Sequence, residues 1–295
     1  MLFLYLPDED FSLTIEQLIN DKLHFLQQHG IETSKFELRM LLGFVLDLDV
    51  NALYFYKFPL NKEQLAAFEY LVKQRLDGWP VDKIIGQKGF YKYDFIVNRD
   101  VLSPRPDTEV LVEKALLLLK SDQPQKILEF GIGSGCILLS LLAEIPYAAG
   151  VGIDISAKAL SVAASNAEKL GVASRLTLRE ISWFDANIRD MPEKDFDMIV
   201  SNPPYIPSGD IAKLDREVKD FDPLTALDGG ADGLRDYRQI AYLAGSLLKK
   251  DGFLLFEGGI GQAHEIADIG KSNGFDLIDI VEDLNHIERC IILKK

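Results

Sequence analysis

The segment Asn202–Tyr205 carries residue types that could hold a planar nitrogen for reaction. It consists of Asn202, Pro203, Pro204 and Tyr205, and it follows an apolar strand predicted over Asp197–Ser201. An amide or aniline-like NH2 group is a poor nucleophile because its lone pair is delocalised, and it carries two N–H donors. The side-chain oxygen of Asn202 and a main-chain carbonyl, for which we expect that of Pro203, can accept these donors and turn the lone pair toward an electrophile. The ring of Tyr205 can stack on the substrate plane and stabilise positive charge.

Two successive prolines give this segment its shape. They fix φ and exclude both a helix and a strand ladder, so we expect a short extended turn at the end of the strand. A dedicated general base is not required when the nitrogen attacks an electrophile there, because the substituted nitrogen becomes acidic enough to lose its proton to water. Taken alone, the tetrapeptide also fits an ordinary turn that ends a strand, so its meaning depends on the rest of the chain.

A second group of candidate residues forms the glycine-rich loop Gly131–Gly135. The loop lies between a predicted strand, Lys126–Phe130, and a predicted helix, Cys136–Leu142. Glycines at alternate positions let the main chain pass close to a bound molecule, and this is where doubly wound folds bind nucleotides. The dinucleotide fingerprint G-x-G-x-x-G fails, because its third glycine would fall at Cys136. Preceded by the acidic Glu129, the loop instead resembles the cofactor loop of class I methyltransferases. A tight turn without a ligand is the alternative.

Two further residues follow the next strands. Asp154 ends a strand predicted over Gly150–Asp154, where a carboxylate can accept hydrogen bonds from both ribose hydroxyls of a nucleoside. The alternative is a helix N-cap for the segment that starts at Ile155. Trp183 follows the third predicted strand and is a candidate neighbour of an adenine ring, on which it can stack. Its alternative is a core tryptophan at the end of a strand.

Composition and charge limit the classes of partner. The chain has 295 residues and a formal net charge of -14, which argues against broad binding to nucleic acid and favours a protein or small-molecule substrate. No apolar run approaches the roughly 20 residues that a membrane helix needs. The stretch Met1–Pro7 is too short for a signal peptide and lacks a basic start, so we expect a cytoplasmic protein. Cys136 and Cys290 fit a reducing compartment, and no metal-ligand spacing links the cysteines and histidines.

The N-terminal part of the chain has the periodicity of helices. Helices are predicted over Leu13–Gln28, Ser34–Leu48 and Asn61–Leu76. Ser34 and Glu37 have the spacing of a capping box, and Asn61 can cap the third helix. These helices would form either a domain that docks a substrate or a bundle with no site of its own.

After the helices the pattern changes twice. Aromatic and polar residues alternate over Lys88–Val97, which predicts a hairpin that joins two domains. From Lys126 onward, short apolar strands alternate with helices, and this order is typical of an α/β fold with a parallel sheet covered on both faces. The predicted strands are Lys126–Phe130, Gly150–Asp154, Leu176–Arg179, Asp197–Ser201, Gly252–Glu257, Phe275–Val281 and Cys290–Leu293.

With these segments in place, the chain resembles the glutamine-N5 methyltransferases, most closely the release-factor glutamine methyltransferases (the PrmC/HemK family). The resemblance covers nearly the whole chain. It is carried by Phe36–Leu42, Leu102–Glu109, Leu128–Gly135, Ser201–Pro207, Ala226–Leu234 and Tyr237–Arg238. Adenine-N6 methyltransferases share the Asn-Pro-Pro-Tyr motif, whereas the second and fifth of these segments are more specific. The resemblance implies a helical domain for substrate docking at 1–80, a hairpin linker at 81–107 and a Rossmann-like, seven-stranded methyltransferase domain at 108–295.

The resemblance also implies an activity and assigns residues to it. The expected reaction moves a methyl group from S-adenosylmethionine to the side-chain nitrogen of the glutamine in the Gly-Gly-Gln motif of class I peptide-chain release factors. Residues that match cofactor contacts are Glu129, Gly131, Ile132, Gly133, Ser134, Gly135, Asp154, Trp183 and Asn202. Those that match substrate contacts are Asn202, Pro203, Pro204, Tyr205 and Arg105, with Asn202, Pro203 and Tyr205 in the catalytic role. The expected partners are release factors, with no membrane, no stable nucleic-acid binding, no metal and a monomeric state.

Three other functions remain open at this point. The same chemistry could act on a glutamine of a ribosomal protein, although the linker and the helical domain favour release factors. Adenine-N6 methylation of nucleic acid is disfavoured by the acidic balance. A non-catalytic cofactor-binding protein would have little reason to keep Asn202–Tyr205. For Arg105 the alternative is the start of a surface helix. The acidic residues Asp228, Asp232 and Asp236 could indicate a metal site, but methyl transfer needs none and Gly229-Gly230 indicates a turn.

Overall fold

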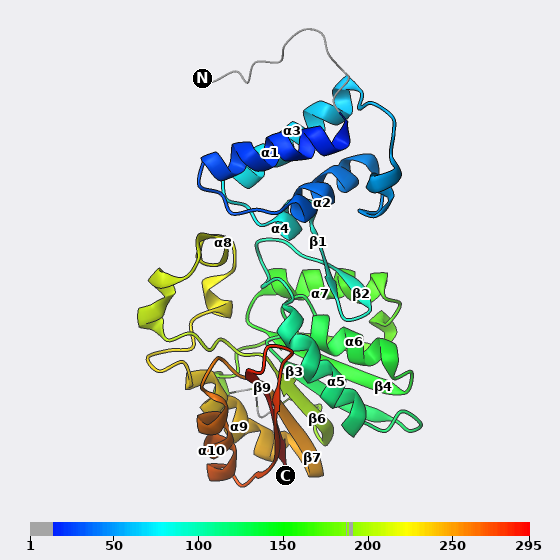
Figure 1. Cartoon of the computed structure of the whole chain (residues 1–295). Helices are drawn as coiled ribbons and strands as arrows, with labels where there is room; N and C mark the ends of the chain where they lie inside the picture. Colours follow the sequence, from blue (N-terminus) through cyan, green and yellow to red (C-terminus); the bar gives the residue numbers. More distant parts are fainter. Residues whose placement is uncertain (1–13, 187, 189–190) are drawn as a thin grey trace. The chain divides into compact units, whose positions relative to one another are not determined.

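The chain contains two compact units in the computed structural model, Met1–Gly86 and Gln87–Lys295 (Figure 1). The structure describes residues 14–186, 188 and 191–295. The N-terminal stretch on which the signal-peptide argument rests, and the start of the predicted domain 1–80, lie outside these residues. The boundary at Gly86 falls inside the segment 81–107 that the sequence assigns to a linker.

The first unit is made of helices, as its periodicity predicts. They are α1 (Ile15–Gln28), α2 (Lys35–Leu46), the 3-10 helix η1 (Ala52–Phe55), α3 (Lys62–Leu76) and the short α4 (Val81–Ile85). Thr14, Ser34 and Asn61 each form a capping box with the residue three positions later, which confirms the caps predicted for Ser34 and Asn61. The helices enclose one apolar cluster whose fully buried members include Ile19, Leu26, Leu38, Leu41 and Phe68. This small core holds the unit together.

The second unit is built on a seven-stranded sheet, which confirms the α/β fold class. Its strands are β3 (Gln125–Phe130), β4 (Ala148–Asp154), β5 (Leu176–Glu180), β6 (Phe196–Ser201), β7 (Leu248–Glu257), β8 (Asp276–Glu282) and β9 (Glu288–Lys294). Their order is β5-β4-β3-β6-β7-β9-β8, and β9 runs antiparallel to both of its neighbours. The carboxyl ends of β3, β4, β6 and β7 therefore lie along one edge of the sheet, where doubly wound folds place their ligands.

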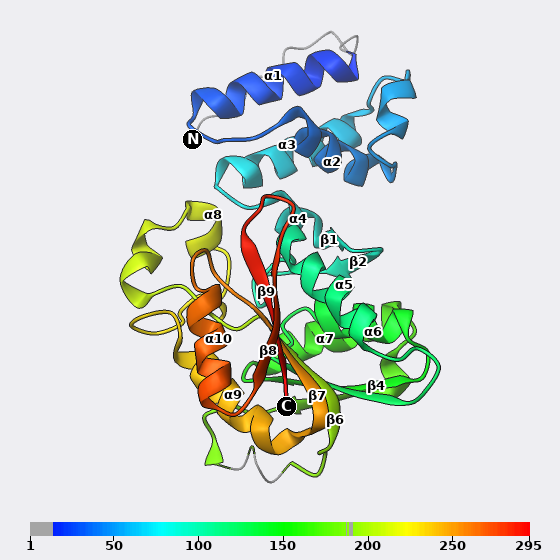
Figure 2. The ribbon, with the colours of Figure 1, turned by 60° about the horizontal axis from the view of Figure 1, so that its bottom comes forward.

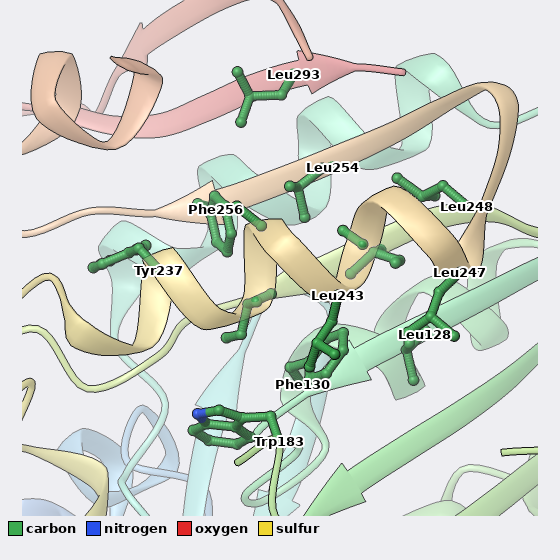
Figure 3. Packing of buried hydrophobic residues seen from close by; sticks show 14 of the residues in the cluster. Leu128, Phe130, Trp183, Tyr237, Leu243, Leu247, Leu248, Leu254, Phe256 and Leu293 are labelled. Carbon is green, nitrogen blue, oxygen red and sulfur yellow. The ribbon is translucent and has the colours of Figure 1, made fainter. Parts of the chain in front are cut away.

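Helices cover both faces of the sheet, and each helix presents an apolar side to it (Figures 1 and 2). The helices α9 (Arg235–Leu247) and α10 (Ala263–Ser272) lie on one face, and α5 (Glu109–Leu118), α6 (Cys136–Glu144) and α7 (Ala157–Lys169) lie on the other. Figure 3 shows side chains of α9, among them Tyr237 and Leu243, pointing toward residues of the strands. Alternate residues of β3 enter the two cores, with Phe130 in one and Ile127 in the other.

The hairpin is packed into this second unit. Its strands β1 (Gln87–Phe90) and β2 (Tyr93–Ile96) pair antiparallel. Phe90 and Phe95 are buried in the same core as α5 and α6. The main-chain N–H of Tyr91 also donates to Glu109 Oε1 at the start of α5, at 2.9 Å. The hairpin predicted from the aromatic alternation is confirmed, and its two phenylalanines anchor it to the sheet domain.

A segment of short elements separates β6 from α9. It contains the 3-10 helix η5 (Ser208–Lys213), α8 (Arg216–Lys219) and a second 3-10 turn, η6 (Leu224–Ala226). Short helices of this kind lack the longer periodicity from which a helix can be predicted. Within the described part of the chain, no helix combines the length and the apolar character that crossing a bilayer requires.

Candidate active site

A cavity lies at the carboxyl ends of β3, β4 and β6, where doubly wound folds bind their ligands. The predicted site residues that line it are Arg105, Glu129, Gly131, Ile132, Gly133, Ser134, Asp154, Trp183, Asn202 and Pro204. Gly135, Pro203 and Tyr205 are not in the lining. The structure thus brings together residues that are up to 99 positions apart in the sequence, from Arg105 to Pro204, and the strand ends among them meet because parallel strands end at one edge of the sheet.

The glycine loop has a conformation that other residues rarely adopt. Gly131, Gly133 and Gly135 have φ angles of 74°, 53° and 83°, all in the left-handed region that favours glycine. A Cβ atom on Gly131 would lie 3.6 Å from the indole ring of Trp183. The loop therefore needs its glycines for the turn itself, and their lack of side chains also leaves the main chain open to the cavity.

Asp154 is built into the floor of the cavity by main-chain hydrogen bonds. Its Oδ2 atom accepts from the N–H of Gly133 at 3.0 Å, and its Oδ1 atom accepts from the N–H of Ser156 at 2.9 Å. Burial raises the pKa of Asp154, and these main-chain donors oppose the shift. The side chain that caps α7 is Ser156, which accepts from the N–H of Ala159, so the N-cap alternative for Asp154 is wrong.

Glu129, near the end of β3, links the glycine loop to the helix α6 that follows it. The side chain is 1% exposed, and its Oε2 atom accepts from the N–H of Leu138 in the first turn of α6 at 3.0 Å. Burial raises the pKa of Glu129 well above its usual range, and the charge of Asp154 raises it further. The acidic residue that precedes the glycines thus binds the helix that follows them.

Trp183 belongs both to the core and to the cavity. Its ring packs against Phe130 with the ring centroids 6.4 Å apart, and both side chains are seen in Figure 3. The indole N–H donates to the buried Asp236 at 2.8 Å, which fixes the ring. Trp183 also lines the cavity. Its two interpretations from the sequence are therefore compatible.

Asn202 is the first residue after β6, and Ser201 anchors it by donating to the carbonyl of Phe130 at 2.8 Å. The Asn202 side chain is held from the side by the segment before α5, because Nδ2 donates to Thr108 Oγ1 at 3.4 Å. Pro203 and Pro204 are buried, and neither lies in a helix or strand. Burial raises the pKa of the Tyr205 hydroxyl, which stays in its protonated form.

Comparisons with known proteins identify this arrangement. The sequence model described as PrmC N-terminal domain matches residues 17–86, and the one described as Methyltransferase small domain matches residues 106–214. A release factor glutamine methyltransferase of Rhodospirillum rubrum is 41% identical over 97% of this chain and 87% of the relative. One of Geobacter sulfurreducens is 39% identical over 94% of this chain and 95% of the relative. The chain belongs to the release factor glutamine methyltransferase family.

The fold of this family member is also found in more distant enzymes. The crystal structure of a methyltransferase from Pyrococcus furiosus covers 70% of this chain and 90% of its own, with a TM-score of 0.50 and 17% identity. That likeness concerns the fold alone. The family membership and the fold together make this chain a methyltransferase, which confirms the enzyme class expected from the sequence.

The Leu-Asp-Gly-Gly segment, one of the more specific marks of the family resemblance, packs directly against the residues that follow Asn202. Ile206 and Asp228 form a parallel bridge, and the N–H of Ile206 donates to the Leu227 carbonyl at 3.0 Å. A Cβ on Gly229 would lie 2.6 Å from the Pro204 carbonyl oxygen. Gly233 has a φ of 75°, and a Cβ atom on it would lie 2.3 Å from the Tyr205 carbonyl oxygen. These glycines therefore allow two main-chain segments to touch.

A pair of substitutions tests this close approach. We expect Gly233→Ala to lower the free energy of unfolding by about 2–5 kcal/mol, since it adds a main-chain clash to a left-handed conformation that itself costs about 1–2 kcal/mol. Gly171→Ala is the matched control, because Gly171 has a φ of 70° and open space around its Cβ position. Denaturant unfolding of both variants measures the difference. Equal losses of stability would show that contact with Tyr205 is not what selects glycine at position 233.

Arg105 lies at the cavity but its guanidinium has a partner. Its NH2 atom is 3.2 Å from Oδ2 of Asp222, whose side chain is 2% exposed, while that of Arg105 is 46% exposed. The ring of Phe221 lies 5.8 Å from the guanidinium of Arg99. Two arginines of the segment before α5 thus hold the loop that precedes Pro223, and both segments line the cavity.

Several supporting residues were not predicted from the sequence. The fully buried Asn166 on α7 donates to the carbonyls of Ser134 and Ile96, at 2.8 and 3.0 Å, and so ties the glycine loop to the hairpin. Thr108 contacts Asn202 as described above. Glu257 is a buried carboxyl at the end of β7. The sequence signals such a supporting residue only as a single polar residue in an apolar helix or strand. That signal does not indicate which site residue it contacts.

The acidic residues near Gly229-Gly230 have ordinary partners. Asp228 accepts from the Ser208 hydroxyl and the Gly230 N–H, Asp232 pairs with Arg238, and Asp236 holds Trp183. Among the described residues, no group of three or more histidine, cysteine, aspartate or glutamate side chains is arranged to hold a metal. Each of these carboxylates therefore has a structural function within the segment.

Proposed function

We propose that this enzyme transfers the methyl group of S-adenosylmethionine to the side-chain amide nitrogen of the glutamine in the Gly-Gly-Gln motif of class I release factors. The observation that carries the proposal is the meeting of Asn202 with the glycine loop and Asp154 in one cavity. Curated relatives that cover most of the chain are named release factor glutamine methyltransferases, which supports the choice of substrate.

The cavity fits the proposed cofactor. Asp154 offers a half-buried carboxylate for ribose hydroxyls, and Trp183 offers the face or edge of an indole to a purine. The glycine loop leaves main-chain surface free for the amino-acid end of the molecule. When bound, S-adenosylmethionine would supply an electrophilic methyl group on a positively charged sulfur. We assign Gly131, Ile132, Gly133 and Ser134 to this contact, with Glu129 and Gly135 shaping the loop.

The chain's own residues would prepare the amide nitrogen. Asn202 Oδ1 and the carbonyl of Pro203 accept its two N–H groups, which turns the lone pair toward the methyl group and stabilises the charge of the transition state. Pro204 fixes the turn, and the protonated Tyr205 stacks against the substrate plane. The nitrogen would gain a bond to the methyl carbon while the bond from that carbon to sulfur breaks, which leaves S-adenosylhomocysteine. The nitrogen would then give one proton to water. Arg105 would contact the substrate at the mouth, in exchange for or beside its bond to Asp222.

The substrate assignment is tested by competition between acceptors. The enzyme is incubated with methyl-labelled S-adenosylmethionine and, in turn, with a class I release factor, total ribosomal protein, and DNA or RNA. We expect label on the release factor alone. Transfer to nucleic acid without transfer to release factor would contradict the proposal and favour adenine-N6 chemistry, and label on a ribosomal protein would favour the second glutamine substrate.

The remaining properties follow from this function. Release factors act in translation, so we propose that the enzyme works in the cytoplasm, which agrees with its free thiols Cys136 and Cys290. A monomeric state and the use of the helical domain for docking stay predictions. So do the domain limits at 80 and 107. Gel filtration coupled to light scattering, with and without a release factor, measures the first of these properties.

A further inference from the structure

A buried carboxyl group beside Asn202 has no part in the reaction proposed above. Glu257 is the last residue of β7 and is 3% exposed. Its Oε2 atom has no hydrogen-bond partner among the described residues. Burial raises the pKa of Glu257 to about 7. Since a buried carboxylate costs free energy that an apolar side chain of similar size would not, its presence at the end of a strand calls for a functional reason.

The sheet places this carboxyl next to Asn202, the first residue of the segment Asn202–Tyr205 that we propose binds the substrate amide. Ser201 of β6 pairs with Phe256 of the parallel strand β7, so Asn202 and Glu257 are the next residues along the two strands. The Tyr237 hydroxyl donates to the Glu257 carbonyl at 2.7 Å, which fixes the main chain there. Hydrogen bonding from the side chains of Thr108 and Asn202 lowers the pKa of this carboxyl and so favours its ionised form. Thr108 also accepts from Asn202 Nδ2.

These contacts decide which way the Asn202 amide points. The oxygen and the NH2 group of an asparagine side chain are nearly equal in shape, so only the surrounding donors and acceptors select one orientation. An ionised carboxylate accepts hydrogen bonds and donates none. It therefore draws the NH2 group of Asn202 inward and leaves Oδ1 on the side of the cavity. A protonated carboxyl can donate to Oδ1 and would lose this preference.

We propose that Glu257 is a positioning residue whose ionised carboxylate, together with the Thr108 hydroxyl, holds the Asn202 amide with its oxygen toward the N–H groups of the substrate. This inference rests on the methyl transfer proposed above and adds a residue to it. In the reverse orientation, Asn202 would present N–H donors to the N–H donors of the substrate amide. No hydrogen bond could then form between the two groups, and the substrate amide would not be held.

The proposal has a consequence for pH. The charged and titratable groups that face Glu257 are Arg289 and Cys290 on β9, Asp107 before α5, Tyr205 after β6, Tyr237 on α9 and Cys136 on α6. Arg289 favours the carboxylate, although its own hydrogen bonds go to Gly258, Asp283 and Asp107. The folded-state pKa of about 7 lies above the ordinary value of 4.5. Activity is therefore present above about pH 7 and falls as pH drops through that value.

The test compares three substitutions in the full-length enzyme with a release factor as substrate. Glu257→Leu removes the acceptor, Glu257→Gln keeps an acceptor that does not titrate, and Thr108→Val removes the hydroxyl. Asp197→Asn is the control, because Asp197 lies at the opposite end of β6, where it pairs with Lys249. The readouts are kcat and KM for the release factor, the Kd of S-adenosylmethionine, and kcat/KM from pH 5.5 to 9.

We expect Glu257→Leu to lower kcat about 10- to 100-fold, with KM and the cofactor Kd changed less than about twofold. Glu257→Gln should stay within about threefold of wild type at pH 8.5 and lose the fall in kcat/KM below pH 7. If Glu257→Leu does not fold, Thr108→Val and Glu257→Gln decide: the first should lower kcat several-fold, and the second should flatten the profile.

A wild-type kcat in Glu257→Leu would overturn the inference. If that variant does not fold, a wild-type kcat in Thr108→Val would overturn it. A change in KM without a change in kcat would also overturn it. An unchanged acid limb in Glu257→Gln would overturn it as well. These results differ from failure of the proposed function, in which the wild-type enzyme itself transfers no methyl group to the release factor.

Discussion

Asn202→Ala is expected to lower kcat by about 10²–10³-fold or more, the largest loss of any single substitution in this enzyme. Removing one preorganised hydrogen-bonding group from a transition-state site costs about 2.7–4 kcal/mol in enzymes where this has been measured. In the proposed mechanism, the lost oxygen accepts one N–H of the substrate amide. The amide nitrogen of Asn202 donates to Thr108 over a long distance of 3.4 Å, so the fold should lose little. Steady-state transfer of labelled methyl groups to a release factor measures the effect.

A loss of activity in Asn202→Ala supports the proposed role only if the variant still folds and still binds the cofactor. The melting temperature and the Kd of S-adenosylmethionine should stay close to the wild-type values in Asn202→Ala. Asn273→Ala is a suitable control, because Asn273 ends α10 and donates to the Ile269 carbonyl far along the chain from the cavity. An Asn202→Ala enzyme that keeps more than a tenth of the wild-type kcat would show that the Asn202 oxygen does not orient the nitrogen.

Asp154→Ala is expected to weaken binding of S-adenosylmethionine by about 100-fold while binding of the release factor changes little. Two hydrogen bonds from ribose hydroxyls to a carboxylate contribute roughly 1.5–3 kcal/mol each, of which part is recovered by water. Asp154 also accepts from the N–H groups of Gly133 and Ser156, so its removal loosens the loop too. Asp154→Asn keeps one acceptor oxygen and should lose about tenfold. Calorimetry gives both dissociation constants.

The same residue predicts how cofactor binding depends on pH. Burial raises the pKa of Asp154 above 3.8, so the carboxylate that we propose binds ribose is lost as pH falls through this raised value. Binding should therefore weaken at acid pH in the wild type and much less in Asp154→Asn. Asp276→Ala, at an exposed position of β8, serves as the control. Equal weakening of cofactor and release factor by Asp154→Ala would contradict the ribose role.

The order of the strands could be predicted only in part. Apolar runs such as Lys126–Phe130 stand between loops and helices, so their existence follows from local pattern, and the caps at Ser34 and Asn61 follow from local chemistry. The place of β9 between β7 and β8 does not, because pairing between strands distant in the sequence depends on the whole sheet. The hairpin was recognised, but the burial of Phe95 beneath it could not be read from alternation alone.

For the site, motif order was more informative than residue type. Strand ends in a parallel sheet must meet, so a glycine loop, Asp154 and Asn202 in successive strand ends predict one cavity, and the structure has it. The residues that contact Asp154 and Asn202 could not be predicted from the sequence. Glu257 ends an apolar strand and looks like any polar residue at a strand terminus. Only its burial and its neighbours Thr108 and Asn202 show that it lies beside the site.

The most direct test of the central claim is the chemical position of the methyl group on the product. A class I release factor is incubated with the enzyme and S-adenosylmethionine, digested, and sequenced by tandem mass spectrometry. We predict one added methyl group on the glutamine of the Gly-Gly-Gln motif, on the side-chain nitrogen, absent when Asn202→Ala replaces the wild type. A methyl group on another residue, or on an oxygen or carbon atom of that glutamine, would contradict the account.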